Sequence, residues 1–511
     1  MARPAIVLIG FMGAGKTTGA RMFASALGTR VVDSDKRVEK RLGCSIAEYF
    51  AREGEAAFRR VEAEVAGELL ERADGGVIAL GGGTVGSDRV RRALERHTVV
   101  LLQVSRATAW KRAKRSDRPL ARDRKAFDRL FAERETLYES VADVLLPEVD
   151  RQKLKPAIPV IARAHEAAPG TTLLWSHAGD GGAPVWLRPG LLRELPPWPL
   201  PEASRRIAIT DETVAEHHAG RVPGLAGMIE IPPGESHKTL ATCERVWGAL
   251  AAQGVTRSDH VVAIGGGVVG DLAGFVAATY QRGVPVVQVP TTLVAQVDSA
   301  YGGKTGVDLP SAKNYVGAFH QPAAVMVDPD ALTTLPPEEL AAGYAEVVKT
   351  ALIAGGALWE QVASGAPVDP LMVLRCARTK LQVVAEDERD GGRRQVLNLG
   401  HTIGHAIETV TDYRRYRHGE AVALGLLAAL RLSGQEALRD QVGELLRHAG
   451  LPTTMDPAID VDEVQEATSR DKKRLGAGPV PFVVVRAPGD VRYGQQLGAT
   501  DVRAAIAELS G

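Results

Sequence analysis

The sequence predicts an α/β protein, with two regions in which strands alternate with helices and a third region that is mainly helical. In residues 4–165 and again in residues 183–335, short apolar runs of strand length are separated by helical patterns. Alternation of this kind is typical of a parallel sheet covered by helices on both faces. After Pro336-Pro337 the chain becomes rich in Ala, Leu and Glu with a 3.6-residue period, which predicts helices.

The individual elements follow the hydrophobic pattern. Apolar runs rich in β-branched residues predict strands, and the segments between them carry helical periodicity. The predicted strands of the two α/β regions are 5–9, 77–80, 98–104, 206–209, 260–264 and 284–289. The predicted helices are 17–27, 55–72 and 106–115 in the first region and 337–353, 370–385, 401–410 and 420–432 in the third, which also has one strand at 480–485.

The length predicts several domains. At 511 residues the chain exceeds the roughly 250–300 residues at which a single hydrophobic core stops growing. A stretch rich in Gly, Thr, Ser and Asp interrupts the first α/β pattern near residue 170 and is typical of a linker. We therefore predict an α/β domain over 1–168, a linker over 169–182, a second α/β unit over 183–335 and a helical unit over 336–511.

The composition excludes several classes of protein. Lys+Arg and Asp+Glu both number 62, a net charge of +0, so nothing favours binding to nucleic acid or to a membrane surface. No run approaches the roughly 18–20 apolar residues of a membrane span, and the N-terminus has no signal-peptide pattern. Three cysteines without a CxxC pair (Cys44, Cys243 and Cys376) favour a reducing compartment. We expect a cytoplasmic enzyme.

A phosphate-binding motif lies between the first predicted strand and the first predicted helix. Residues 10–17, GFMGAGKT, fit G-x-x-x-x-G-K-[ST] in the strand-to-helix context that the motif requires. Its glycines let backbone N–H groups surround phosphate oxygens at a helix N-terminus. Lys16 is expected to reach the β- and γ-phosphates, and the Thr17 hydroxyl to bind Mg²⁺. The first domain is therefore predicted to bind a nucleoside triphosphate.

Carboxylates and arginines beyond this motif indicate what receives the phosphate. Asp33 and Asp35, at the end of a strand, point the same way and could both face the site. Arg59, Arg118 and Arg134 follow; any one arginine is more often a surface charge, but guanidinium pairs clamp carboxylates well. As a set, these residues make residues 4–165 resemble shikimate kinase.

This resemblance implies roles for the first domain. Shikimate would be held by Asp35, Arg59, Gly82 and Arg134, with Arg118 as the lid arginine and Asp33 near the Mg²⁺. ATP would be bound by Gly13, Gly15, Lys16, Thr17, Thr18 and, against adenine, Arg112. Lys16, Asp35 and Arg118 are the expected catalytic residues. Residues 81–86 also fit the dinucleotide pattern G-x-G-x-x-G, but their context assigns them to the acceptor pocket.

A second glycine motif follows the strand at 260–264. Residues 265–270, GGGVVG, fit the dinucleotide fingerprint between a strand and a helix. Asp211 ends a neighbouring strand, where a carboxylate could hold a ribose hydroxyl. A structural glycine turn is the alternative at this position.

Histidines and a carboxylate in the helical region predict a metal site. His401 and His405 lie on one helical face at i, i+4, His418 precedes another helix, and Glu346 lies on an apolar helix. Two histidines and one carboxylate leave an open coordination position, which is a catalytic zinc arrangement. Histidines that are merely hydrogen-bonded are the alternative.

Residues 183–511 resemble 3-dehydroquinate synthase, through GGGVVGDLAGF, the segment 281–314, YAEVVK and LNLGHTIGHAIE. The resemblance implies that Zn²⁺ or Co²⁺ is bound by Glu346, His401 and His418, with His405 as a polar or proton-transfer residue instead of a ligand. It implies NAD⁺ contacts from Asp211, Glu235, Lys238, Gly266, Gly267, Asp271, Thr291, Thr292 and Asp298. It implies substrate contacts from Lys304, Lys313, Asn314, Lys349, Lys380, Arg394 and Asn398, of which Lys304, Lys349 and Arg394 are expected to be catalytic. Arg282 would reach into the site of a neighbouring subunit, which implies a homodimer.

The sequence departs from this family at two positions and leaves three questions open. Asp390 stands where the family commonly has Glu, and Thr213 where it has an asparagine. Either Lys472 or Lys473 could face the substrate. A metal-dependent alcohol dehydrogenase is the alternative for the second half, although a neutral polyol does not need this set of cations. A nucleotide sensor without an acceptor is the alternative for the first half.

Overall fold

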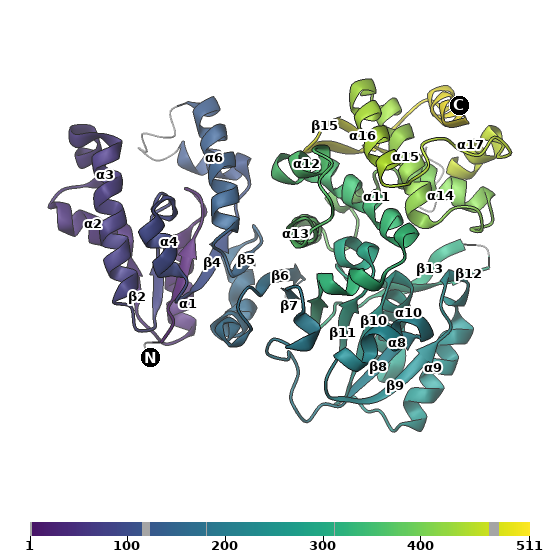
Figure 1. The fold of residues 1–511 in the computed structure, drawn as a ribbon, viewed down its shortest axis with the longest axis horizontal. Helices are drawn as coiled ribbons and strands as arrows, with labels where there is room; N and C mark the ends of the chain where they lie inside the picture. The colour runs from purple at the N-terminus through teal and green to yellow at the C-terminus, as the bar shows by residue number, and fades with distance from the viewer. Residues whose placement is uncertain (1–2, 115–122, 180, 311, 470–479, 511) are drawn as a thin grey trace. The chain divides into compact units, whose positions relative to one another are not determined.

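The structure is a computed structural model that describes residues 3–114, 123–179, 181–310, 312–469 and 480–510. Its contacts divide the chain into two units, Met1–Pro199 and Leu200–Gly511, which are described separately below (Figure 1). No helix among the described residues is long and apolar enough to cross a membrane.

The first unit is built on a sheet of order β2-β3-β1-β4-β5-β6-β7, in which only β7 is antiparallel to its neighbour. The central strand, β1 (Ile6–Ile9), is buried along its whole length, as expected for a strand covered on both faces. The other strands are β2 (Val31–Asp33), β3 (Val77–Ala79), β4 (Thr98–Leu102), β5 (Val144–Leu146), β6 (Thr172–Ala178) and β7 (Gly181–Leu187).

Helices connect the parallel strands of this unit. They are α1 (Lys16–Ala26), α2 (Ser34–Leu42), α3 (Ile46–Glu71), α4 (Asp88–Leu94), α5 (Arg106–Ala113), α6 (Arg124–Glu139) and α7 (Ile158–Ala162). α3 begins at a capping box, because Ser45 accepts from the Glu48 amide while Glu48 accepts from the Ser45 amide. Gly54, with φ 81, kinks α3 ahead of the turns that carry the acceptor-site residues.

The predicted linker, 169–182, differs from what the structure contains. These residues hold β6 and the start of β7, which pair as a hairpin at the edge of the first sheet. The buried side chains of Trp175 and Trp186 anchor the hairpin, so it belongs to the core of the first unit. The glycines that suggested a flexible linker form the hairpin turn instead, and the units divide after Pro199.

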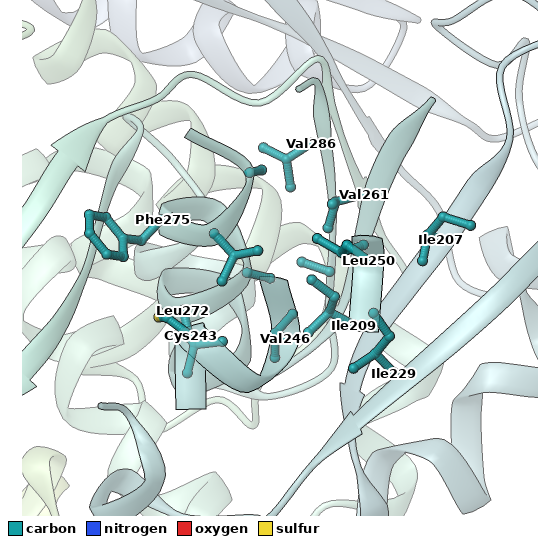
Figure 2. Close-up of a cluster of buried hydrophobic side chains, with 14 of the residues drawn as sticks. Ile207, Ile209, Ile229, Cys243, Val246, Leu250, Val261, Leu272, Phe275 and Val286 are labelled. Carbon is teal, nitrogen blue, oxygen red and sulfur yellow. The ribbon is translucent and has the colours of Figure 1, made fainter. Parts of the chain in front are cut away.

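The second unit begins with a parallel sheet of order β14-β11-β10-β8-β9. Its strands are β8 (Arg206–Asp211), β9 (Leu225–Ile231), β10 (His260–Gly265), β11 (Val286–Pro290) and β14 (Ala324–Val327), joined by helices that include α8 (Glu212–His218), α9 (Leu240–Ala252) and α10 (Gly267–Thr279). Figure 2 shows the core between the sheet and these helices, where Val261 of β10 packs with Val246 of α9 and Leu272 of α10.

The rest of the second unit is mainly helical, as predicted. Its helices are α11 (Pro337–Ala354), α12 (Gly356–Ala363), α13 (Pro370–Glu386), α14 (His401–Val410), α15 (His418–Leu432), α16 (Glu436–His448), α17 (Val461–Ser469) and α18 (Ala499–Ala507). Two hairpins were not predicted as such: β12 (Lys304–Leu309) with β13 (Ala312–Phe319), and β15 (Phe482–Ala487) with β16 (Asp490–Gln495). The first of them carries several predicted substrate cations.

Candidate active sites

The phosphate loop of the first unit joins β1 to α1. Gly13 and Gly15 adopt φ 82 and 78, a left-handed backbone that glycine reaches without strain. Gly15 is the N-cap of α1 and provides no side-chain cap, so the first amides of the helix face the loop. Lys16 Nζ donates to the Gly10 carbonyl at 2.8 Å, which holds the ammonium over the loop. The loop therefore fits the phosphate tail of a nucleotide.

Two predicted Mg²⁺ residues meet beside this loop. The Thr17 hydroxyl donates to Asp33 Oδ2 at 2.8 Å. A hydroxyl and a carboxylate at the end of a phosphate loop are oxygen ligands of the kind that Mg²⁺ takes. Asp33 also caps α2 by accepting from the Asp35 amide at 3.0 Å, which orients both carboxylates. Thr18 follows Thr17 in the first turn of α1.

The acceptor-site residues converge on the glycine run after β3. A Cβ at Gly81 would lie 2.7 Å from Asp35 Oδ1, and a Cβ at Gly83 would lie 1.9 Å from an Arg59 nitrogen, so only glycine lets these side chains approach. Arg134 donates to the Gly82 carbonyl at 3.0 Å. One carboxylate and two guanidinium groups from three helices thus lie against the same glycine run.

Sequence reasoning missed Glu62 in this pocket. Its side chain is buried, and it accepts from Arg59 at 2.6 Å. Burial raises the pKa of Glu62, while the Arg59 charge opposes that rise. Its position three residues after Arg59, on the same face of α3, was the available signal.

Arg112 and Arg151 flank the phosphate loop. Arg112 donates to the Gly13 carbonyl at 2.9 Å, next to the site where the sequence predicts adenine. Arg151 was not predicted, yet a Cβ at Gly15 would lie 2.6 Å from its Nη2. Burial and the Arg112 charge lower the pKa of Arg151, because two cations are held near each other at the loop. Arg118, the predicted lid arginine, lies outside the described residues.

The second glycine turn lies between β10 and α10. A Cβ at Gly266 would lie 2.8 Å from Thr292 Cγ2, and one at Gly267 would lie 3.2 Å from Ser299 Oγ. The Thr291 side chain is buried, and its hydroxyl finds no hydrogen-bond partner among the described residues. A buried hydroxyl of this kind is explained by a bound ligand or water, so the turn fits a dinucleotide.

The predicted NAD⁺ residues outside the turn form ion pairs and caps. Lys238 Nζ lies 2.7 Å from Asp271 Oδ2 and 3.6 Å from Glu235 Oε1. Asp211 ends β8 and caps α8 by accepting from the Val214 amide at 2.9 Å. Asp298 lies among lysines of the helical region, with Oδ2 2.9 Å from Lys380 Nζ.

The three predicted metal ligands converge on one point. Glu346 Oε1 lies 3.4 Å from His401 Nε2 and 3.4 Å from His418 Nε2. Ligand atoms bound to tetrahedral zinc at 2.0–2.1 Å lie about 3.3–3.4 Å apart. The Glu346 carboxylate oxygen therefore stands at this separation from each of the two imidazole nitrogens.

The second nitrogen of each histidine ligand is also engaged. His401 Nδ1 lies 3.1 Å from the Leu399 carbonyl oxygen, and His418 Nδ1 lies 3.3 Å from Glu408 Oε2. Such contacts orient imidazoles so that Nε2 faces the metal. Burial by itself would lower the pKa of His418, but hydrogen bonds to Glu346 and Glu408 raise it to about 10. The carboxylates thus stabilise positive charge where the metal would lie.

His405 completes a cluster with these histidines. Ligand atoms of His401, His405 and His418 all lie within 4.8 Å of one another. The His401 and His405 rings, one turn apart on α14, are 5.2 Å apart between centroids. A third imidazole at this distance can exchange a proton with a group bound at the metal.

Buried lysines surround the ligands. Lys349 Nζ lies 2.5 Å from Glu346 Oε2 and 3.5 Å from Asp298 Oδ1, inside a helix face that is almost fully buried. Burial lowers the pKa of Lys380 to about 8, although Asp298 opposes the shift. Carboxylates compensate the buried charge of these ammonium groups and hold them in place, and ammonium groups can bind an anionic substrate.

The β12–β13 hairpin and the turn before α14 supply the remaining cations. Lys304 pairs with Asp390, which has φ 64, and Lys313 Nζ lies 3.0 Å from Glu408 Oε1. Asn314 accepts from Lys238 at 2.6 Å. Arg394 is buried and donates to the Gly302 carbonyl at 3.0 Å. Asn398 ends the 3₁₀ turn Arg393–Asn398, two residues before the N-cap of α14.

Arg282 does not join this pocket. It lies beyond the C-terminal end of α10, in a turn where Gln281 and Arg282 adopt φ 49 and 67. The glycine turn lies at the other end of the 13-residue helix, about 20 Å away along its axis. Lys472 and Lys473 lie outside the described residues.

Comparisons with known proteins agree with this geometry. Family models for the N-terminal and C-terminal parts of 3-dehydroquinate synthase match residues 228–342 and 343–474, and the shikimate kinase model matches residues 12–164. The 3-dehydroquinate synthase of Halorhodospira halophila is 46% identical over 334 residues, which cover 62% of this chain and 93% of that protein. The synthase of Gloeobacter violaceus is 42% identical over 332 residues, which cover 61% and 91%.

A solved structure shares the fold of the second unit. The crystal structure of 2-deoxy-scyllo-inosose synthase complexed with carbaglucose-6-phosphate, NAD⁺ and Co²⁺ is similar with a TM-score of 0.59 and 27% identity, covering 66% of this chain and 100% of that chain. These relatives favour the synthase over the alcohol dehydrogenase alternative, and the kinase match opposes a sensor without an acceptor. The chain is an enzyme of the 3-dehydroquinate synthase family that carries a shikimate kinase domain in the same polypeptide.

Proposed function

We propose that the two sites catalyse two reactions of aromatic (chorismate) biosynthesis. The kinase site transfers phosphate from ATP to shikimate, and the synthase site converts 3-deoxy-D-arabino-heptulosonate 7-phosphate to 3-dehydroquinate and phosphate. The convergence of Glu346, His401 and His418 at 3.4 Å, in the same unit as the glycine turn after β10, carries the second assignment.

At the kinase site the chain positions two anions. The loop amides and Lys16 bind the triphosphate, and Thr17 with Asp33 would hold the Mg²⁺. Arg59 and Arg134 bind the shikimate carboxylate, while Asp35 orients the accepting hydroxyl. Arg118 is assigned by family resemblance to close over both substrates. Because phosphoryl transfer depends mainly on positioning and charge neutralisation, these groups are sufficient for it.

At the synthase site the cations bind the substrate carboxylate and phosphate. Lys304, Lys313, Lys380 and Arg394 are these cations, the neutral amides of Asn314 and Asn398 add hydrogen bonds, and Lys349 contacts both Glu346 and Asp298. His405 exchanges the proton that is transferred at the carbon being oxidised. When bound, Zn²⁺ or Co²⁺ acidifies the reacting alcohol and NAD⁺ supplies reversible hydride transfer.

Two coupled assays on the intact chain test this proposal. We expect shikimate-dependent ADP release, and phosphate release from the heptulosonate without lasting NADH absorbance. Net accumulation of NADH with an alcohol substrate would instead favour a dehydrogenase. Retention of full metal content and synthase turnover in both Glu346→Gln and His401→Ala would contradict the ligand assignment.

We also propose that the chain forms a homodimer through its synthase half and acts in the cytoplasm. The homodimer is supported by Arg282, which is exposed on a left-handed turn remote from its own pocket. The location is supported by three cysteines that are all free thiols. Sedimentation velocity tests the dimer, and mixing Arg282→Ala with His401→Ala chains should restore activity in mixed dimers if Arg282 acts across the interface.

A further inference from the structure

Glu408 is a buried carboxylate that contacts two parts of the synthase site. It follows His401 and His405 on α14 at the i, i+4, i+7 spacing, so all three side chains lie on one helix face. Its side chain is 1% exposed. A buried carboxylate is retained only with partners that compensate its charge, and the partners of Glu408 are functional residues.

The first partner is the metal ligand His418. Glu408 Oε2 lies 3.3 Å from His418 Nδ1, while His418 Nε2 lies 3.4 Å from Glu346 Oε1. A carboxylate on Nδ1 assigns the proton to that nitrogen and leaves Nε2 as the metal donor. Among the described residues, His401 Nδ1 contacts a backbone carbonyl, that of Leu399, whereas His418 Nδ1 contacts a carboxylate.

The second partner is Lys313 of β13. Glu408 Oε1 lies 3.0 Å from Lys313 Nζ, and the ammonium also lies 4.5 Å from the centre of the Tyr413 ring. Tyr413 is placed there by a turn in which it and Asp412 adopt φ 55 and 51, a conformation that non-glycine residues rarely adopt. The turn after α14 thus places the Tyr413 ring against the same ammonium that Glu408 contacts.

We propose that Glu408 is a positioning residue that orients the metal ligand His418 with one carboxylate oxygen and the substrate cation Lys313 with the other. This inference rests on the proposed synthase function and adds a residue to its machinery. It explains why a carboxylate is suited to this position, because His418 and Lys313 contact different oxygens and an amide would present an NH₂ donor to one of them.

The test separates the two contacts of Glu408, one with His418 and one with Lys313. In Glu408→Gln we expect zinc affinity, measured by competition with a chromogenic chelator, to fall 10- to 100-fold, as found when such outer contacts are removed. Glu408→Asp should recover part of that loss. At saturating zinc, Glu408→Gln should raise the KM for the heptulosonate more than it lowers kcat.

Lys313→Met removes the substrate cation that Glu408 contacts and leaves the contact of Glu408 with His418 in place. It should raise KM and leave zinc affinity unchanged, and adding it to Glu408→Gln should raise KM no further, because Glu408 acts on the substrate through Lys313. Asp259→Asn is the matched control. Like Glu408, Asp259 is a buried carboxylate paired with a cation, here Arg205 at 2.7 Å, but it lies next to the N-terminal end of β10. It should lower thermal stability without lowering zinc affinity.

Several outcomes would overturn the inference. The inference fails if zinc affinity in both Glu408 variants stays within twofold of that of the unsubstituted chain. It also fails if Asp259→Asn lowers zinc affinity as much as Glu408→Gln does. If Glu408→Gln unfolds at assay temperature, Glu408→Asp carries the comparison alone. Failure of the proposed function is distinguishable, because Glu346→Gln and His401→Ala would then also keep full zinc affinity.

Discussion

Replacing Gly419 by Ala should damage the metal site and the fold together. Gly419 follows the ligand His418 at the start of α15, where this helix crosses α11. A Cβ at Gly419 would lie 1.9 Å from the Ala342 carbonyl oxygen and 2.6 Å from Ala342 Cα. These are backbone atoms, so no side-chain rotation relieves the overlap.

The magnitude follows from these distances. A contact of 3.0 Å, the shortest that real Cβ atoms make, requires a shift of about 1.1 Å between the two helices. Ala342 lies one turn before Glu346 on α11, so that shift also separates Glu346 from His418. Catalytic sites tolerate displacements of about 0.5 Å, and about 1 Å can reduce the rate about 100-fold. Overpacking costs roughly 1–3 kcal/mol in the free energy of unfolding.

The assay compares Gly419→Ala with Gly443→Ala in the intact chain. A Cβ at Gly443, a buried glycine of α16, would make an ordinary contact at 3.8 Å with Leu427, so alanine should stabilise the helix by about 0.5–1 kcal/mol. We expect Gly419→Ala to lower Tm, zinc affinity and synthase kcat, and Gly443→Ala to lower none of them. Kinase turnover in the same preparations is the internal control for the first unit.

A Gly419→Ala chain that binds zinc and turns over like the unsubstituted protein would refute the reasoning. An equal loss in Gly443→Ala would refute it as well, because the effect would then come from alanine in a helix and not from the contact with Ala342.

The remaining predictions concern two residues of the first unit and the Arg205–Asp259 ion pair of the second unit. Lys16→Ala should abolish shikimate-dependent ADP release and leave synthase turnover unchanged, because Lys16 Nζ donates to the Gly10 carbonyl of the phosphate loop in the first unit; equal loss of both activities would contradict two separate sites. Arg151→Ala should raise the KM for ATP several-fold with kcat little changed, since its guanidinium covers Gly15; an unchanged KM would remove Arg151 from the nucleotide site. The hydrogen bonds from Arg205 hold the pKa of Asp259 well below its usual range, so the pair stabilises the fold above about pH 4 and this contribution is lost as pH falls further. The Tm difference between the unsubstituted chain and Asp259→Asn should therefore shrink in acid, and a constant difference would show that Asp259 does not act through its charge.

Contiguous motifs were predictable because their chemistry is local. The loop around Lys16 and the fingerprint around Gly266 each need only a strand, a glycine turn and a helix, all within a few neighbouring residues. The same holds for His401 and His405, which share a helix face by their spacing. Long helices such as α11 and α13 were predicted nearly to their ends, since a 3.6-residue period sustained over many residues is typical of helices and not of strands or loops.

Residues whose role depends on a partner elsewhere were missed. Glu62, Arg151 and Glu408 were passed over because single charged side chains are usually solvated, and only their neighbours show otherwise. Their spacing from Arg59 and His401 was a usable signal for Glu62 and Glu408. The β6–β7 hairpin was interpreted as a linker because glycine marks both flexible segments and tight turns.

The sequence by itself determined which chemical groups the chain possesses and which local backbone carries them, because turn geometry and helix periodicity depend on residues a few positions apart. Only the tertiary structure decided that Glu346 stands 3.4 Å from both His401 and His418 and that one carboxylate, Glu408, contacts both a ligand and a substrate cation. Those distances depend on how closely α15 approaches α11 at Gly419, a contact between residues far apart in the chain that no local pattern encodes.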